Sequence, residues 1–332
     1  MDTAELEYEL PPELIAQRPA ERRDESRLLV YDRATGAVRH RRFSELPEEL
    51  TRGELVVVNE TRVIPGRLRL PRSGGGDAEV LLLEQVGPDG VWEGLARPSR
   101  RLRAGQRLGP VELLEPLGEG RWRLRLDGEP AGETPLPPYI TEPLADPGRY
   151  QTVYAVEEGS AAAPTAGLHF TPELLAQLDV ERVTLHVGLD TFRPVEADTL
   201  DRHPIHSERY SVEPAAWGRI RAADRVLAVG TTTVRVLETV ASNSLLQAPP
   251  AATNRGSGAS NSLLQGRTGL FITPGYEFRR VDSLLTNFHL PRTTLLALVM
   301  AFAGIEETRR LYRLAIGERY RFYSFGDAML IL

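Results

Sequence analysis

The sequence predicts a mixed α/β (α+β) body with an inserted small all-β barrel domain. From Gly66 to about Thr134, short alternating apolar and polar segments follow one another between glycine-rich turns, and no helical pattern interrupts them. On both sides of this segment, apolar runs rich in β-branched residues pass into helical patterns. Alternation with glycine turns is typical of small barrels, whereas strand-to-helix succession is typical of α/β folds. We therefore expect residues 1–64 and 136–332 to form a discontinuous α/β domain and residues 65–135 the inserted barrel.

Composition supports two domains and excludes several kinds of chemistry. The 332 residues are 41% hydrophobic and 26% charged, enough for a sizeable core. The N-terminus has no signal-peptide pattern and no run of 18 apolar residues occurs, so we expect a cytoplasmic protein with no membrane contact. Cysteine and lysine are both absent, which excludes thiolate nucleophiles, iron–sulfur clusters, Schiff-base lysines and the lysine of a P-loop.

The first body strand and the barrel follow one another along the chain. Residues 53–65 contain an apolar run of valines typical of a buried strand. In the barrel segment "RWRLRLD", one strand face carries arginines and the other apolar residues. From Arg97 to Arg125 there are eight arginines against three glutamates, a local charge of +5 in a chain of net charge −6. This face is either a solvated surface or a contact for a phosphate backbone.

After Leu136, three junctions place polar residues before helix starts. In "AAAPTAGLHFTPELLAQL", residues 161–178, Thr171 is a predicted N-cap and His169 stands just before the helix. The positive end of the helix dipole favours a neutral His169 ring and lowers its pKa. A strand at 226–229 passes into a threonine-rich helix start at Thr231, and His289 precedes a third helix, apolar on nearly all sides. Such junctions are either ordinary caps or an anion site in one shared cavity.

Three other segments need separate comment. Residues 183–190 alternate strictly, which predicts a strand with His186 on its polar side. "DRHPIHSE" has histidines at i and i+3, but the proline between them argues against a metal site on one helix face. "ASNSLLQ" occurs at 241–247 and again at 259–265, and we expect this duplicated stretch to be a flexible, dispensable loop.

Many motifs, in order along almost the whole chain, resemble the S-adenosylmethionine:tRNA ribosyltransferase-isomerase family of queuosine biosynthesis. They include "VVVNETRVIPGRL", "LPPYI", "YQTVYA", "AAPTAGLHFT", "TLHVGLDTFRPV", "HPIHSE", "VGTTTVRVLE", "FITPGYEF", "DSLLTNFHLPRTTLLALVMAFAG" and "YRFYSFGDAMLIL". The sequence departs from the family's pattern at two places. Asp190 stands where the family usually has glycine, and the loop between Glu238 and Phe271 is longer than usual.

The resemblance implies a transferase and isomerase acting on tRNA. The ribosyl part of S-adenosylmethionine would be transferred to 7-aminomethyl-7-deazaguanine at the wobble position, giving epoxyqueuosine with release of adenine and methionine. S-adenosylmethionine would then be a consumed substrate, so no cofactor and no metal are expected. We also expect the protein to be a monomer.

The resemblance also implies site residues. The expected catalytic residues are Thr165, His169, His186 and His289. The expected substrate-binding residues are Arg62, Tyr139, Tyr150, His206, Glu208, Thr231, Thr232, Arg235 and Asn287, with the two tyrosines stacking on a base. The expected tRNA-binding residues are Arg97, Arg100, Arg101, Arg121, Arg123 and Arg125.

Two other functions stay open from the sequence. One is an S-adenosylmethionine-dependent RNA methyltransferase, which would release S-adenosylhomocysteine. The other is an RNA-binding protein whose barrel binds RNA without turnover of a donor.

Overall fold

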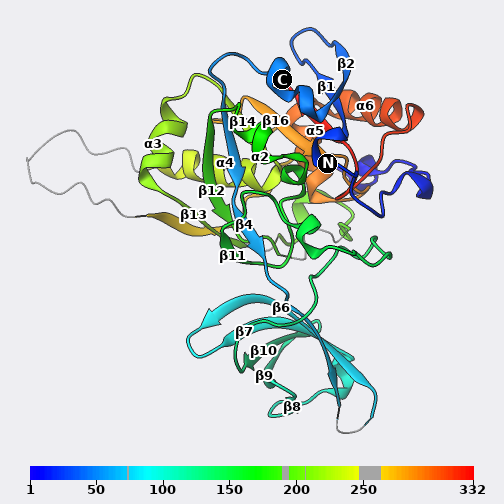
Figure 1. The fold of residues 1–332 in the computed structure, drawn as a ribbon, viewed down its shortest axis with the longest axis vertical. Helices are drawn as coiled ribbons and strands as arrows, with labels where there is room; N and C mark the ends of the chain where they lie inside the picture. The colour runs from blue at the N-terminus through cyan, green and yellow to red at the C-terminus, as the bar shows by residue number, and fades with distance from the viewer. Residues whose placement is uncertain (73–74, 189–193, 206, 247–262) are drawn as a thin grey trace, which may run out of the picture.

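Two large sheets, one in each part of the molecule, organise the fold (Figure 1). The computed structural model describes residues 1–72, 75–188, 194–205, 207–246 and 263–332. The upper part in Figure 1 is a mixed α/β body, and the lower part is a nearly closed, barrel-like antiparallel sheet. The predicted fold class is therefore confirmed.

The body contains a nine-stranded sheet. Its strands are, in order, β15 (Leu264–Thr268), β13 (Glu208–Val212), β12 (Val180–Leu185), β3 (Leu55–Asn59), β14 (Val226–Val229), β16 (Ser283–Asn287), β17 (Ala328–Ile331), β1 (Arg27–Tyr31) and β2 (Val38–Arg42). The four adjacent strands β12, β3, β14 and β16 are parallel, with Val56 opposite both Val180 and Leu227. Their carboxyl ends therefore meet at one edge of the sheet.

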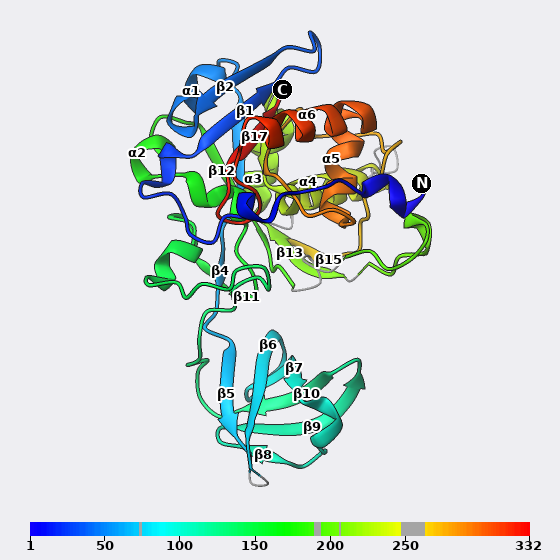
Figure 2. The same ribbon diagram turned by 90° about the vertical axis from the view of Figure 1, so that its right-hand side faces the viewer.

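Apolar side chains cover both faces of this sheet. In β3, Leu55 and Val57 face the helices α3 (Pro214–Ala222), α4 (Thr231–Leu246), α5 (Thr294–Ala303) and α6 (Ile305–Gly317). Val56 and Val58 face a thinner layer, which includes α1 (Leu46–Glu49) and α2 (Pro172–Leu175). Figure 2 shows α1 and α2 on one side of the sheet and α4, α5 and α6 on the other. Burial on both faces explains the continuous apolar run of β3.

The second sheet has six antiparallel strands. They are β5 (Arg67–Pro71), β6 (Asp77–Gly87), β7 (Val91–Arg97), β10 (Arg121–Leu126), β9 (Val111–Gly118) and β8 (Arg107–Leu108), in sheet order. All six lie inside the segment predicted to be inserted. Trp122, Leu124 and Leu126 are buried in its core, as the alternation in β10 predicts.

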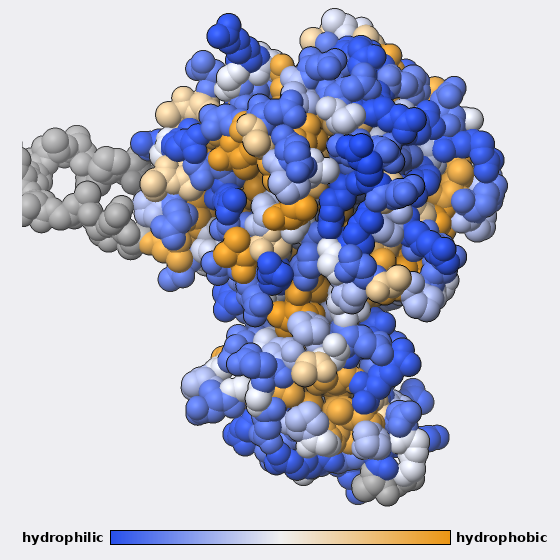
Figure 3. Space-filling view, viewed as in Figure 1, coloured by the Kyte–Doolittle hydropathy of each residue, from blue (hydrophilic) through white to orange (hydrophobic). Residues whose placement is uncertain are grey.

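A short parallel pair lies where the two parts join. It consists of β4 (Thr61–Val63) and β11 (Glu157–Ser160). On the face seen in Figure 3, hydrophilic residues cover most of the surface and apolar residues gather at the neck between body and barrel. In the described part of the chain, no helix combines the length and the apolar character needed to cross a membrane.

The helix starts predicted from the sequence are confirmed, but two elements, α2 and β12, are shorter than predicted. The Thr171 hydroxyl caps α2 by accepting a hydrogen bond from the Leu174 amide at 3.2 Å, but α2 has only four residues. α4 begins at Thr231, and α5 is largely buried as predicted. β12 ends at Leu185 and so is shorter than the alternation predicts. Asp190 lies outside the described residues.

Candidate active site

Polar side chains gather at the carboxyl edge of the four parallel strands. Asn59 ends β3, His186 follows β12, Thr231 follows β14 after one glycine, and Asn287 ends β16. Gly230 has φ +85°, a conformation that L side chains rarely adopt, and it turns the chain from β14 directly into α4. In open α/β sheets this edge is the usual place for a ligand.

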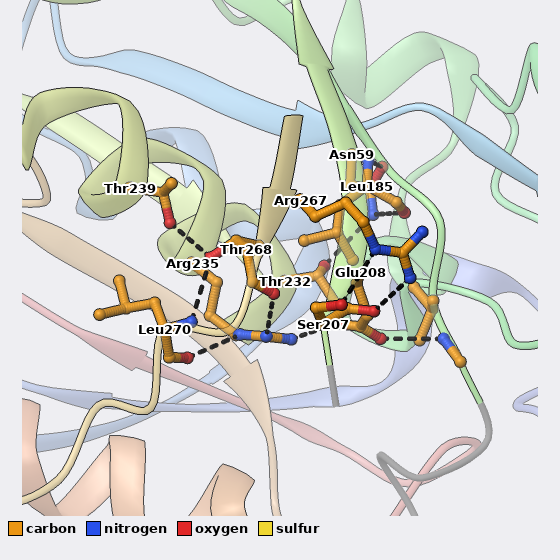
Figure 4. A network of polar contacts seen from close by, with 12 residues as sticks. Asn59, Leu185, Ser207, Glu208, Thr232, Arg235, Thr239, Arg267, Thr268 and Leu270 are labelled. Atoms are coloured by element: carbon orange, nitrogen blue, oxygen red, sulfur yellow. Dashed lines mark hydrogen bonds and ion pairs between the residues drawn. The ribbon is translucent and has the colours of Figure 1, made fainter. Parts of the chain in front are cut away.

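Asn59 ties three of these segments together (Figure 4). Its fully buried side-chain amide donates to the Leu185 carbonyl at 3.0 Å, and its oxygen accepts from the Leu185 amide at 3.0 Å. The amide also donates to the Thr232 hydroxyl at 3.4 Å. Asn59 therefore fixes the end of β12, just before His186, against the start of α4. Our sequence reasoning missed this residue, although an amide at the end of a valine run was a usable signal.

A first cavity, of about 180 Å³, lies between the body and the barrel. Its body side includes His186, Glu208, Thr231, Thr232 and Arg235, all predicted site residues, and its barrel side includes Glu84, Glu93 and Arg121. The structure thus brings together residues that are up to 151 positions apart in the sequence.

Arg235 is committed to protein partners in this cavity (Figure 4). Its guanidinium donates to the Glu208 carboxylate and to the carbonyls of Leu270 at 3.1 Å and Thr268 at 3.2 Å. Glu208 also accepts from the Gly188 amide at 2.9 Å. Because these bonds use all three guanidinium nitrogens, Arg235 holds Glu208 in place. A role for Arg235 in holding the donor's carboxylate or ribose stays a prediction.

An ion pair joins barrel to body beside the same cavity. The Arg267 guanidinium donates to both carboxylate oxygens of Glu84, at 2.7 and 3.1 Å, and to the Ser207 hydroxyl at 2.9 Å. Glu84 belongs to β6 and Arg267 to β15. Neither residue was predicted from the sequence, since nothing local indicates a partner 183 positions away.

A second cavity of about 30 Å³ shares Thr231 and Thr232 with the first. Its other polar lining residues are Thr165, Thr286, Asn287 and His289. The His289 Nε2 atom lies 2.7 Å from the Thr286 hydroxyl oxygen. The Asn287 Oδ1 atom is buried and has no hydrogen-bond partner within the described part of the chain. Since buried polar atoms are normally paired, this oxygen is a candidate acceptor for a ligand.

His169 lies deeper than the sequence suggests. Its side chain is 5% exposed in a 3₁₀ turn, Thr165–His169, and its ring lies 4.9 Å from the ring of Phe43. Nδ1 is 2.7 Å from the Ser26 hydroxyl oxygen, and Nε2 is 3.2 Å from the Asn287 amide nitrogen. Both ring nitrogens therefore have protein partners, and Asn287 connects His169 to the second cavity.

The three central histidines are neutral at pH 7. Burial, and then the charges of Arg321 and Arg23, lower the pKa of His169 to about 3. Burial lowers the pKa of His289 to about 3. Burial and the charge of Arg209 lower the pKa of His186 to about 4, partly opposed by a nearby carboxylate. The predicted direction for His169 is right but its predicted cause is wrong, because α2 is too short for a strong dipole and desolvation dominates.

The structure separates the remaining predicted substrate residues from the cavities. Tyr150 is fully buried, with its ring edge-on to Phe325, so it cannot stack on a base in this conformation. Tyr139 packs 4.8 Å from the ring of Tyr323. Arg62 on β4 donates to the Ala155 carbonyl at 2.7 Å. His206 and the central part of the duplicated loop, 247–262, lie outside the described residues.

Of the six predicted tRNA-binding arginines, Arg121 lines the first cavity, and the other five fall into two sets. Arg123 and Arg125 pair with glutamates of β9, at 3.0 and 3.1 Å. Arg97, Arg100 and Arg101 are exposed at the end of β7 and in the following turn, and within the described ranges they make no ion pair. The described residues also contain no group of three or more histidines, aspartates or glutamates placed to hold a metal ion.

Comparisons with known proteins are consistent over the whole chain. A family model described as "Queuosine biosynthesis protein" matches residues 3–331. The chain is 51% identical, over 100% of its length and 98% of the relative's, to an S-adenosylmethionine:tRNA ribosyltransferase-isomerase of Rubrobacter xylanophilus. It is 52% identical, over the full length of both chains, to a protein of the same name from Moorella thermoacetica.

A solved structure is also similar. The crystal structure of an S-adenosylmethionine tRNA ribosyltransferase from Thermotoga maritima superposes with a TM-score of 0.55 at 37% sequence identity. The match covers 99% of this chain and 100% of the other.

Proposed function

The chain belongs to the queuosine biosynthesis protein family, and from this premise we propose that it is an S-adenosylmethionine:tRNA ribosyltransferase-isomerase. The ribosyl part of S-adenosylmethionine is transferred to 7-aminomethyl-7-deazaguanine at the wobble position of a tRNA. The products are epoxyqueuosine in the tRNA, adenine and methionine. The donor is consumed in the reaction, so it acts as a substrate and no cofactor is needed.

One observation carries the proposal: two neutral histidines, His186 and His289, line two cavities that share Thr231 and Thr232 at the carboxyl edge of the sheet. A sulfonium donor is positively charged, so a neutral imidazole beside it is favoured over a charged one. Residues of the barrel, Glu84, Glu93 and Arg121, line part of the first cavity, so a polynucleotide bound to the barrel would lie beside the donor.

His186 is the best candidate for the proton acceptor. It is half-buried and lines the first cavity, whereas His169 and His289 are almost completely buried. It would take a proton from the carbon beside the sulfonium, after which adenine leaves, the amine of the base attacks, and the epoxide closes as methionine leaves. The Glu84 carboxylate would stabilise the imidazolium formed in the first step.

The start of α4 is the best candidate anchor for the donor. Thr231 and Thr232 line both cavities, and the first amides of this 16-residue helix have no partner within the helix. They can bind the methionine carboxylate. The Asn287 Oδ1 atom can accept an N–H from the donor, and His169 then acts as a positioning residue through Asn287.

The exposed arginines of the barrel are the best candidates for contact with the tRNA backbone. Among the residues that the structure describes, Arg97, Arg100 and Arg101 have no acidic partner, whereas Arg123 and Arg125 pair with glutamates. Replacing the first three with glutamine should weaken tRNA binding at low salt, and replacing the paired two should have a smaller effect.

Product analysis tests the reaction. The protein is incubated with S-adenosylmethionine and a tRNA that carries the 7-aminomethyl base, and the products are separated by liquid chromatography. Adenine and methionine in equal amounts support the proposal. S-adenosylhomocysteine would identify a methyltransferase, and tRNA binding with no donor turnover would identify an RNA-binding protein.

Two variants test the assigned roles. His186→Gln should lose most turnover at saturating donor concentration. His169→Gln should keep partial turnover, because it acts through Asn287. His40→Gln, on the outer strand β2, is the control and should keep full turnover. Wild-type turnover in folded His186→Gln protein contradicts the assignment.

A further inference from the structure

A third cavity, of about 20 Å³, lies beside His169 and is surrounded by arginines. Arg23, Arg149 and Arg321 come from three distant parts of the chain and all line it. All three are half-buried, and the hydroxyl-bearing residues Ser26 and Ser324 line the same space. Three cations around so small a space repel one another unless an anion lies between them.

Main-chain carbonyls hold these guanidinium groups in place. Arg23 donates to the carbonyls of Leu168 and Gly148, both at 2.9 Å. Arg149 donates to the carbonyls of Ala20 at 2.6 Å and Glu21 at 3.2 Å, and Arg321 donates to the Arg18 carbonyl at 3.2 Å. Carbonyl groups fix the orientation of a guanidinium without neutralising its charge. The positive groups are therefore preorganised but incompletely compensated.

Two carboxylates are close to the cluster and both have other partners. Asp327 lies 4.0 Å from the Arg321 Nε atom, and its oxygens accept from the Arg27 amide at 2.9 Å and the Arg321 amide at 2.8 Å. Asp146 faces Arg23 and accepts from the Gly148 amide at 2.8 Å. Among the described residues Arg149 has no acidic partner, and its Nε atom is buried without a hydrogen bond.

The positive field of the cluster reaches its neighbours. Burial and the charge of Arg149 lower the pKa of Arg23. The charges of Arg321 and Arg23 add to burial in lowering the pKa of His169. A bound anion would offset both of these electrostatic effects.

We infer that Arg23, Arg149 and Arg321 form a binding site for one phosphate group of an RNA strand. At about 20 Å³ the cavity is too small for a whole nucleotide, so only phosphate oxygens would enter it and the sugars would stay outside. The choice of RNA rests on the proposed function. The site lies on the opposite side of His169 from Asn287, so a strand held here runs beside the histidine that connects to the second cavity.

Binding of an anticodon stem–loop RNA tests the site without any need for turnover. Affinity is measured by fluorescence anisotropy at several salt concentrations for wild type, Arg149→Gln and Arg321→Gln. Loss of one phosphate contact should weaken binding roughly tenfold at low salt. It should also reduce the slope of log affinity against log salt by about 0.7 to 0.9. Arg149→Lys keeps the charge and should keep the slope.

The control is Arg313→Gln, an exposed arginine of α6 that lines none of the three cavities. It should leave affinity and slope unchanged. Unchanged affinity and slope in folded Arg149→Gln and Arg321→Gln proteins would overturn the inference, as would an equal loss in Arg313→Gln.

A separate arm distinguishes RNA from a free anion. Inorganic phosphate is added and the melting temperature is measured. Stabilisation that depends on Arg149, with RNA affinity independent of Arg149, would assign the site to a free anion and overturn the RNA assignment. If the arginine variants lose RNA affinity while wild type gives no adenine, the proposed reaction fails and the phosphate site stands.

Discussion

Acid should reduce the stability of the fold through His169. Its pKa is about 3 in the folded protein, mainly because of burial, against an ordinary value of 6.5. The ring is thus neutral in the folded protein. Between pH 6.5 and pH 3 the unfolded chain binds a proton at His169 that the folded protein does not bind. This contribution to stability is complete above about pH 6.5 and is lost as the pH falls toward 3. Between pH 7 and pH 5 the loss is about 2 kcal/mol.

His169→Gln removes this titration and so tests the reasoning. At pH 7 the variant should be less stable than wild type, because the Ser26 contact and the packing against Phe43 change. At pH 5 the difference should be smaller by about 2 kcal/mol. Protonation of residue 169 in the unfolded chain destabilises the wild type, whereas the variant has no titrating group at this position. Urea unfolding followed by circular dichroism at pH 5, 6 and 7 measures both differences.

The matched control is Arg313→Gln, an exposed arginine of α6; an arginine does not titrate between pH 5 and 7, so this replacement should cost the same stability at both pH values. An equal cost of His169→Gln at pH 5 and pH 7 would refute the claim that burial keeps His169 neutral.

Three further predictions concern buried polar groups. Asn59→Ala leaves the buried Leu185 amide and carbonyl without their partner, so it should cost about 2–4 kcal/mol in urea unfolding and also lower turnover. Glu238 accepts four hydrogen bonds from residues 276–281, three of them from main-chain amides; Glu238→Gln should lower the melting temperature while turnover per folded molecule is unchanged. Arg235→Ala should cost about 3–5 kcal/mol because it leaves Glu208 buried and unpaired, and adding Glu208→Gln should restore part of this; a double variant no more stable than the single one would contradict the pairing.

Local spacing was enough to predict most of the secondary structure. The valine run of β3, the junction at Thr231 and the alternation in β10 each depend on residues within a few positions of one another. The lengths of β12 and α2 were wrong, because an element's end depends on what packs against it and not only on its own pattern.

The sequence indicated the junctions of the site but not which of its side chains pair with one another. His169, Thr231 and His289 stand at strand- or loop-to-helix junctions, and these junctions predicted one shared cavity. The sequence could not indicate that Glu208 forms an ion pair with Arg235, or that Glu84 of the barrel forms one with Arg267. These partners are 27 and 183 positions apart, and only folding brings them into contact.

By itself, then, the sequence determined the fold class, the strand-to-helix junctions and the family, because each is encoded in local patterns or in motifs that keep their order. Only the tertiary structure decided which polar groups are buried, which are paired and which are left to bind a ligand. His169 illustrates the difference. Its place before a helix is local, but its neutrality comes from segments as far away as Ser26 and Arg321, which exclude water from its ring and add positive charge beside it.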